Sequence, residues 1–310
     1  MTATLPPAVQ ELFQRFVTCE LTTIDSRGRP ITWPVTPFYR PGDDHVSVTT
    51  GLGFPKKAAD ARLNPKVALL LSDPTGSDVT RPSMVLVQGI AEVDDHDLDA
   101  NRRRYAADMA RKLGSGRGPG EGSRRFDWFF TRIYLHVRPE RVYVWPGGDC
   151  ELEPDLLSGS PPEPGDAGGG PDGRRALWDS RLAELRRRYD TAVLSIVAPD
   201  GFPFSIRVPV SAARRDRLIH IDADPGGAPM RPGFVCLTAH DHDERLRWMR
   251  NFQVRGDLVQ RPEGDWALIP QRTVGGFELP PTGALTRAIS NYGKIRRFRK
   301  TAKGERERRS

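Results

Sequence analysis

The pattern of hydrophobic and polar residues changes several times along the chain. In residues 1–17, apolar side chains recur every three or four positions, which predicts a short amphipathic helix. The same spacing in residues 178–189 indicates a second helix of this kind. Residues 83–93 alternate apolar and polar side chains, as a half-buried strand does, whereas residues 67–71 are continuously apolar and fit a buried strand. The chain is therefore expected to be rich in short strands, with a few small helices.

Residues 21–37 have the pattern of a β-hairpin. Its turn is the segment from Asp25 to Gly28, because a glycine there can adopt the positive φ that a tight turn requires. Pro34 and Pro37 fall in or after the second strand, and proline cannot donate a hydrogen bond to a neighbouring strand. We therefore expect the second strand to lie at a sheet edge, with its free edge facing a ligand.

The hairpin is repeated later in the chain. Leu21 and Gly28 match Leu194 and Gly201 at a constant offset of 173 residues. Other matches at this offset are Leu12 with Leu185, Phe16 with Tyr189, Thr18 with Thr191, Pro30 with Pro203, and Val35 with Val208. Farther on, the matches Val87 with Val254 and Gly89 with Gly256 have an offset of 167. A constant offset that includes the turn residues predicts two copies of one domain, the second shorter by six residues.

Between these matching segments, the first copy carries a candidate phosphate site. Lys56 and Lys57 open a predicted short helix after the turn at residues 51–55. Unpaired N–H groups and the helix dipole favour an anion at a helix start, although a solvated pair of lysines would have the same pattern. The second copy has residues 222–233 here, with three prolines, three glycines and two aspartates. Prolines and glycines predict a loop here and not a helix, and the two aspartates would repel a phosphate, so the second copy is expected to have lost the phosphate site.

Residues 8–146 resemble the FMN-binding split β-barrel family, which includes pyridoxamine 5'-phosphate oxidase and the flavin/deazaflavin oxidoreductases. The likeness lies in the order of the hairpin, a strand ending in Thr49 and Thr50, the basic helix start, Asn64-Pro65 and the next strand. Phe54-Pro55 departs from the family pattern, where a serine often precedes the basic pair. The resemblance implies two tandem split barrels of antiparallel strands with short flanking helices, mainly β within the α+β class.

The resemblance also implies a function and a site. It implies an oxidoreductase that uses FMN or the deazaflavin F420 to transfer a hydride to or from a small organic substrate. A non-catalytic flavin or haem carrier, or a binding module without cofactor, is the alternative. The implied phosphate ligands are Thr49, Thr50, Lys56 and Lys57. The implied neighbours of the cofactor ring are Trp33, Pro34, Val35, Thr36 and Gln88, and no catalytic residue is assigned.

The predicted organisation has four parts. Residues 1–150 form the first copy, 151–176 a flexible Gly/Pro-rich linker, 177–285 the degenerate second copy, and 286–310 a basic tail. A further flexible insertion is expected at residues 113–123, after a helix at 98–112. Family barrels pair as homodimers with the cofactor between them, so the two copies are expected to form an intramolecular pseudodimer, with or without further dimerisation.

The charge distribution, the cysteines and the histidines limit which partners and ligands are expected. The net charge of +7 is that of residues 294–310 alone, which are expected to be a solvated extension, so nucleic acid is not expected as a partner. Cys19, Cys150 and Cys236 have no metal-binding spacing, and with no apolar segment of membrane-spanning length they favour a cytoplasmic protein. Residues 240–243 contain two histidines, but we expect a polar turn there and no metal site.

Overall fold

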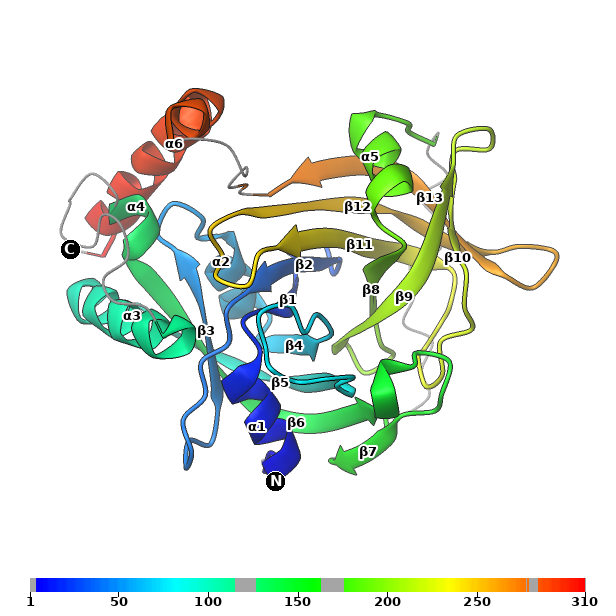
Figure 1. Cartoon of the computed structure of the whole chain (residues 1–310), viewed down its shortest axis with the longest axis horizontal. Coiled ribbons are helices and arrows are strands. Elements are labelled where there is room, and N and C mark those ends of the chain that lie inside the picture. The colour runs from blue at the N-terminus through cyan, green and yellow to red at the C-terminus, as the bar shows by residue number, and fades with distance from the viewer. Residues whose placement is uncertain (1–3, 115–126, 163–175, 277, 279–283, 310) are drawn as a thin grey trace.

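A computed structural model describes residues 4–114, 127–162, 176–276, 278 and 284–309 (Figure 1). The first copy forms an antiparallel sheet in the order β2-β1-β4-β5-β6-β3, with β7 paired to β6. Its strands are β1 (Cys19–Ile24), β2 (Pro30–Val35), β3 (Val46–Gly51), β4 (Lys66–Leu71), β5 (Met84–Asp94), β6 (Arg132–Trp145) and β7 (Asp155–Ser158). Its helices are α1 (Pro7–Arg15), α2 (Lys56–Leu63), α3 (Leu98–Leu113), α4 (Asp127–Phe130) and the 3₁₀ turn η2 (Pro146–Gly148).

The second copy is a closed barrel of antiparallel strands in the order β10-β13-β12-β11-β8-β9. Its strands are β8 (Thr191–Val197), β9 (Pro203–Ala213), β10 (Leu218–Ile221), β11 (Gly233–His242), β12 (Met249–Gln260) and β13 (Trp266–Gly275). The helix α5 (Ser180–Arg188) precedes β8, and α6 (Ala284–Glu307) follows β13. The predicted fold class, mainly β with antiparallel strands and short helices, is confirmed.

The strand registers of the two copies correspond. Thr22 of β1 pairs with Ala68 of β4, and its counterpart Ser195 of β8 pairs with Cys236 of β11. Each copy also has a β-bulge at the same place, between Gln88 and Gly89 in β5 and between Arg255 and Gly256 in β12. At both glycines a Cβ would lie within 2.3 Å of a carbonyl oxygen on the paired strand, so no larger residue fits. The positions 88 and 255 are therefore equivalent.

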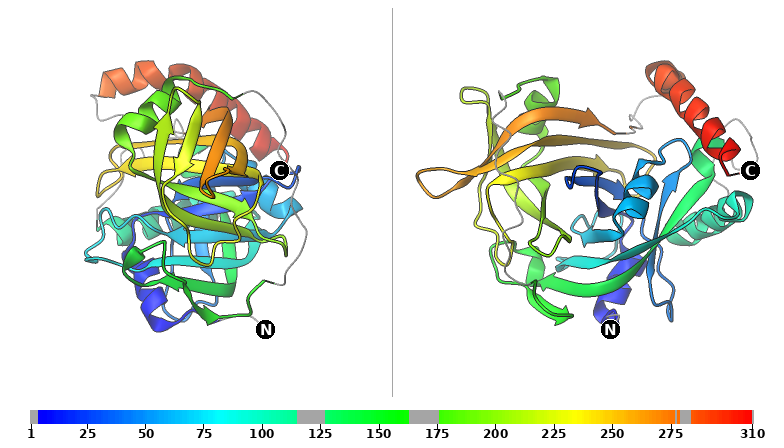
Figure 2. Two further views of the ribbon diagram at one scale, coloured as in Figure 1. Left: turned by 90° about the vertical axis from the view of Figure 1, so that its right-hand side faces the viewer. Right: turned by 180° about the vertical axis from the view of Figure 1, so that it is seen from behind.

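The two copies share a hydrophobic core. Phe204 of β9 packs edge-on against Tyr143 and Trp145 of β6, with ring centroids 5.7 and 6.0 Å away. This core also contains Leu70 and Leu86 of the first copy, all buried. A second core lies beneath α1 and α2 of the first copy and also includes Ala302 of α6. The right-hand view in Figure 2 shows the first copy and the closed barrel side by side.

The helix α6 corrects the prediction of a solvated extension at residues 294–310. Phe298 packs on Phe54 and Trp128 of the first copy, with ring centroids 4.1 and 5.5 Å away. Ala302 is also buried, and Ile295 packs against the same core. These apolar residues recur at helical spacing, and the surface that they cover is far away in the sequence. The prediction failed because it weighed charge and not this periodicity.

Other predicted elements occur with small shifts. The expected helices at 98–112 and 178–189 correspond to α3 and α5. Residues 240–243 were expected in a polar turn, but β11 continues to His242, so this prediction is wrong. Most of the predicted insertion at 113–123 and of the predicted linker lies outside the described residues. In the described part of the chain, we find no helix that is both long and apolar enough to span a membrane.

Candidate functional site

A cleft of about 260 Å³ lies where the hairpin of the first copy meets β11, β12 and β13 of the second. Most of the side chains around it are cationic, and one carboxylate is among them. The lining residues are Asp25, Arg27, Arg29, Lys56, Phe234, Arg255, Gln271 and Arg272. A concave site with this excess of positive charge suits an anionic ligand.

The β1–β2 turn presents two of these arginines. The Asp25 carboxylate accepts hydrogen bonds from the backbone N–H groups of Arg27 and Arg29, at 2.9 and 3.1 Å. Gly28 has a φ of 73°, as predicted, which closes the turn. The Arg29 guanidinium carbon lies 4.1 Å from the ring centroid of Phe234, a cation–π contact between the two copies. The local turn chemistry therefore places positive charge at the cleft.

The bulge in β12 positions the cation of the second copy. Arg255 stands at the bulge, directly opposite Arg272 of β13 in the strand register. Its guanidinium donates to the Gln253 side-chain oxygen at 2.5 and 2.8 Å, which fixes its direction. Like charges opposite each other in a sheet are unfavourable, so an anion between Arg255 and Arg272 would stabilise this arrangement.

Lys56 is the predicted site residue that lines the cleft. Its ammonium lies 2.8 Å from a carboxylate oxygen of Asp60, one turn along α2. Burial raises the pKa of Asp60, and the charge of Lys56 opposes this rise. Even with Lys56 paired to Asp60, arginine charge exceeds carboxylate charge around the cleft.

Lys57, Thr49 and Thr50 are not among the residues that line the cleft. Burial and the nearby Arg132 lower the pKa of Lys57 to about 8. The Thr50 hydroxyl donates to the carbonyl oxygen of Phe54 at 2.7 Å and so closes the turn before α2. Thr49 is buried. The structure thus gives Thr50 a local structural contact, and the phosphate role of these residues stays a prediction.

The strand β2, with Trp33, Pro34 and Val35, lies at the end of the sheet order, as the prolines predict. Thr36 follows directly after it. The second copy covers part of this edge, because the Thr32 carbonyl accepts hydrogen bonds from Thr238 and Gln253. The expectation of a fully free edge facing a ligand is therefore wrong at Thr32. Its contact with the second copy could not be anticipated from the hairpin alone.

Gln88 contacts the second copy and does not line the cleft. Its side chain donates to the Pro203 carbonyl oxygen at 2.9 Å and accepts from Arg141 at 2.9 Å. Gln88 is equivalent to Arg255, which lines the cleft. The surroundings of Gln88 are therefore the counterpart of the cleft, the location that corresponds to it when the two copies exchange roles. There Arg141 forms an ion pair with Asp200 at 2.5 Å.

The charges at equivalent positions differ between the two places. Asp200 is equivalent to Arg27 by the offset of 173, and Arg141 is equivalent to Arg272 by strand register. The ion pair of Asp200 and Arg141 thus occupies the counterpart of the cleft, whereas two arginines, Arg27 and Arg272, occupy the same positions at the cleft. Lys66 also contacts this ion pair, because its ammonium donates a hydrogen bond to the Asp200 carbonyl oxygen at 2.6 Å. Of the two sites, the cleft is the one whose lining residues carry more positive than negative charge at these equivalent positions.

No family model matches the sequence, and no curated protein matches it. Solved structures similar to half of this chain do exist. A conserved hypothetical protein from Mycobacterium tuberculosis is 20% identical over 51% of this chain and 96% of its own, with a TM-score of 0.36. An F420 reductase is 21% identical over 44% and 98%, with a TM-score of 0.34. HutZ, the haem storage protein from Vibrio cholerae, is 19% identical over 46% and 95%, with a TM-score of 0.33.

Sequence reasoning missed the arginines of the cleft. Arg27 and Arg29 belong to a turn that the sequence predicts, but their role depends on the second copy, which lies opposite. For Arg255 and Arg272 the available signal was the matched glycine pair, Gly89 and Gly256, which marks a bulge in both copies. Comparing the residue before each glycine would have shown glutamine replaced by arginine.

Proposed function

We propose that the cleft between the two copies binds FMN or F420 and that the protein is an oxidoreductase acting on a small organic molecule. The observation that carries this proposal is the pair Arg27 and Arg272, at positions where the other side has the ion pair of Asp200 and Arg141. A cofactor phosphate would form charge-assisted hydrogen bonds with the arginines that outnumber the one carboxylate lining the cleft. Phe234 offers an aromatic surface beside that charge. When bound, either cofactor supplies hydride-transfer chemistry, while the protein supplies position and electrostatics.

The same comparison supports one cofactor per chain. At the counterpart of the cleft, Arg141 is already ion-paired with the Asp200 carboxylate, and Lys66 donates to the Asp200 carbonyl oxygen. In addition, the segment of the second copy equivalent to α2 contains no helix between β10 and β11. We therefore propose that residues 1–150 and 177–285 act as the two halves of a pseudodimer with a single site.

A substitution that gives the cleft the charges found at its counterpart tests whether the cleft binds the cofactor. Arg27→Asp places a carboxylate near Arg272, as Asp200 lies near Arg141, so the variant should keep its stability and lose cofactor affinity. Losing one charge-assisted contact corresponds to about tenfold to a hundredfold in dissociation constant. Arg215→Asp makes the same charge change at an exposed residue outside the cleft and serves as the control. Titration of FMN and F420, followed by fluorescence, measures the affinities.

Equal affinities for the parent and Arg27→Asp would contradict the cleft as the site. Lys56→Ala and Lys57→Ala then show whether the phosphate lies at the start of α2 instead. Two bound cofactors per chain would contradict the single site.

Whether the bound cofactor can be reduced distinguishes an oxidoreductase from a cofactor carrier. The oxidoreductase proposal predicts that a nicotinamide donor, or an F420-reducing system, reduces the cofactor and that a small acceptor reoxidises it. Cofactor binding without reduction by any donor would favour a carrier. Stoichiometric haem binding without affinity for FMN or F420 would contradict the proposed cofactor.

A further inference from the structure

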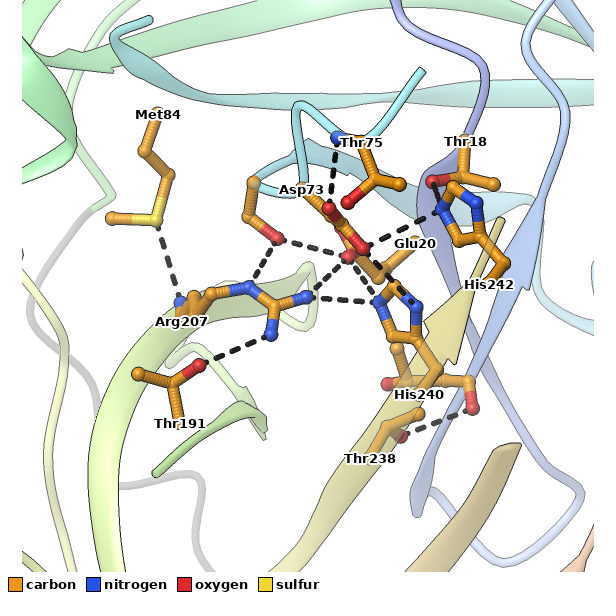
Figure 3. Close-up of polar contacts among 12 residues, drawn as sticks. Thr18, Glu20, Asp73, Thr75, Met84, Thr191, Arg207, Thr238, His240 and His242 are labelled. Atoms are coloured by element: carbon orange, nitrogen blue, oxygen red, sulfur yellow. Dashed lines mark hydrogen bonds and ion pairs between the residues drawn. The ribbon is translucent and has the colours of Figure 1, made fainter. Parts of the chain in front are cut away.

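A second polar cluster lies on another part of the surface between the copies. It combines Glu20 of β1 and Asp73, two residues after β4, with His240 and His242 of β11 (Figure 3). Both histidine side chains are 1% exposed and that of Glu20 is fully buried, whereas that of Asp73 is 16% exposed. His240 and His242 alternate along the strand, so their parallel rings face the same side. One ligand atom each from Asp73, His240 and His242 lies within 4.8 Å of the others.

The hydrogen bonds of His242 leave one ring nitrogen with a lone pair. Its Nδ1 lies 3.0 Å from the carbonyl oxygen of Asp243, which can only accept, so Nδ1 carries the proton. The neutral ring therefore has its lone pair on Nε2. This atom lies 2.9 Å from the Thr18 hydroxyl and 3.4 Å from an oxygen of Asp73. His242 is thus oriented by a carbonyl group on one side and faces a carboxylate on the other.

His240 is oriented in the same way by Glu20. Its Nε2 lies 2.6 Å from Glu20 Oε1, and a carboxylate accepts, so Nε2 is the donor. Arg207 Nη2 lies 2.9 Å from both atoms; because a protonated Nε2 cannot accept, the Arg207 guanidinium donates to the Glu20 carboxylate and not to the ring. The other ring nitrogen, Nδ1, is buried and has no hydrogen-bond partner among the described residues. It lies 3.8 Å from Asp73 Oδ2.

Asp73 completes the group. Its Oδ1 accepts the backbone N–H of Thr75 at 3.0 Å, which directs Oδ2 towards the two rings. The separations of 3.4 and 3.8 Å from Oδ2 to the ring nitrogens exceed an ordinary hydrogen bond. These three acceptor atoms face one another, and of the two ring nitrogens only His242 Nε2 has a donor in the described part of the chain, the Thr18 hydroxyl, so a cation between the three atoms would stabilise the group.

We propose that Asp73, His240 and His242 bind one divalent transition-metal ion of the zinc type. Two imidazoles and a carboxylate are a common ligand set for zinc, and they leave a fourth position for water. Tetrahedral ligands about 2.1 Å from zinc lie roughly 3.4 Å apart, so the Asp73–His242 separation already fits. The remaining separations require side-chain shifts of about 1 Å or less. Thr18 turns its hydroxyl proton away when the metal binds.

Glu20 acts as a positioning residue in this site. A metal-bound histidine commonly donates its other N–H to a carboxylate, which fixes the ring and raises its basicity. The hydrogen bond from His240 to Glu20 supplies this arrangement, and Asp243 supplies a backbone carbonyl for His242. Entry is through Asp73, the partly exposed member of the group. The competing occupant is a proton on His240, which would make an imidazolium paired with Asp73.

Metal titration tests this site without reference to the cofactor. Full-length protein treated with a chelator is titrated with Zn²⁺ by calorimetry and with Co²⁺ by visible absorption. We expect one ion per chain and cobalt bands typical of tetrahedral nitrogen and oxygen ligands. His242→Ala and Asp73→Asn should each weaken zinc binding at least tenfold, and Glu20→Gln should weaken it about tenfold to a hundredfold. His96→Ala, an exposed histidine elsewhere, is the control and should change nothing.

Circular dichroism establishes that each variant is folded, and His240→Gln provides a second variant of similar size. Zinc binding that is unchanged in both His242→Ala and His240→Gln would overturn the proposal. So would a parent protein that binds zinc no more tightly than these variants, because the cluster would then hold a proton. FMN and F420 titrations of the chelated parent show separately whether the proposed cofactor site fails.

Discussion

Thr22 Oγ1 lies 3.5 Å from Ser195 Oγ, and the two residues occupy equivalent positions 173 residues apart. Thr32 and Ser205, another pair at this offset, complete the group, with hydroxyl separations of 2.6 Å from Thr32 to Ser195 and 2.8 Å from Thr22 to Ser205. Equivalent residues approach one another only near the axis that relates two copies. These four buried hydroxyls therefore mark a pseudo-twofold axis through the contact between the copies.

Removing one of these hydroxyls should destabilise the whole chain. Thr22→Val leaves buried partners without a hydrogen bond, so we expect the free energy of unfolding to fall by about 1 to 3 kcal/mol. Urea denaturation followed by circular dichroism measures the change. Ser211→Ala, which removes an exposed hydroxyl of β9, should stay within about 0.5 kcal/mol of the parent. A Thr22→Val variant as stable as the parent would mean that the neighbouring hydroxyls satisfy one another.

The shared core predicts that the two copies unfold together. Phe204 of the second copy packs on Tyr143 and Trp145 of the first, so Phe204→Ala should cost about 3 to 5 kcal/mol. Tryptophan fluorescence and circular dichroism should give coincident transitions, with a lowered midpoint in the variant. Phe204→Leu keeps most of the apolar volume and should cost much less. Two separated transitions in the parent protein would contradict this prediction.

The parts predicted correctly from sequence depend on local chemistry. The turn from Asp25 to Gly28 and the helix beginning at Lys56 each require a few neighbouring residues, so a short pattern specifies them. The tandem arrangement followed from two constant offsets, and the equivalent bulges show that the offsets describe the strand register. Domain boundaries depend on residues between these elements, and they stay predictions.

The parts that sequence reasoning missed depend on contacts between distant segments. His240 meets Glu20 and Asp73 only because β11 packs beside the first copy, and no spacing within residues 240–243 indicates this. Arg255 reaches the cleft through the bulge and meets the hairpin of the other copy. Gln88, placed near the cofactor from the resemblance, contacts Pro203 because the second copy provides that carbonyl.

The packing of α6 against the first copy makes the C-terminal segment a contributor to stability. Phe298→Ala removes an aromatic ring that packs on Phe54 and Trp128, so we expect a loss of about 2 to 4 kcal/mol. Deleting residues 284–310 should lower the melting temperature further, because it also uncovers the surface beneath Ala302. Arg299→Ala changes the adjacent exposed residue and should have little effect. A melting temperature that is unchanged by the deletion would contradict this prediction and support the interpretation of the tail as a solvated extension.

Lys57 gives the protein a predictable dependence on pH. Burial and Arg132 lower the pKa of Lys57 to about 8, below the ordinary 10.5 that applies to the unfolded chain. Between these values the unfolded state binds more protons than the folded state, so the contribution of Lys57 to stability rises with pH. Below pH 8 the folded protein bears the full cost of a buried ammonium, and above 10.5 the cost disappears.

Lys57→Met should therefore stabilise the protein at pH 7 by about 1 to 3 kcal/mol, and this gain should shrink as the pH rises to 10.5. Urea denaturation of parent and variant at a series of pH values measures the difference. Lys303→Met replaces a lysine whose side chain is 81% exposed, and its effect should not vary with pH in this way. Because Lys57 does not line the cleft, Lys57→Met should leave the affinity for FMN and F420 at pH 7 unchanged if the cofactor phosphate binds there, and lower it if the phosphate binds at the start of α2. A variant less stable than the parent at pH 7 would mean that the Lys57 ammonium is well solvated or paired, and that its pKa lies near the ordinary value.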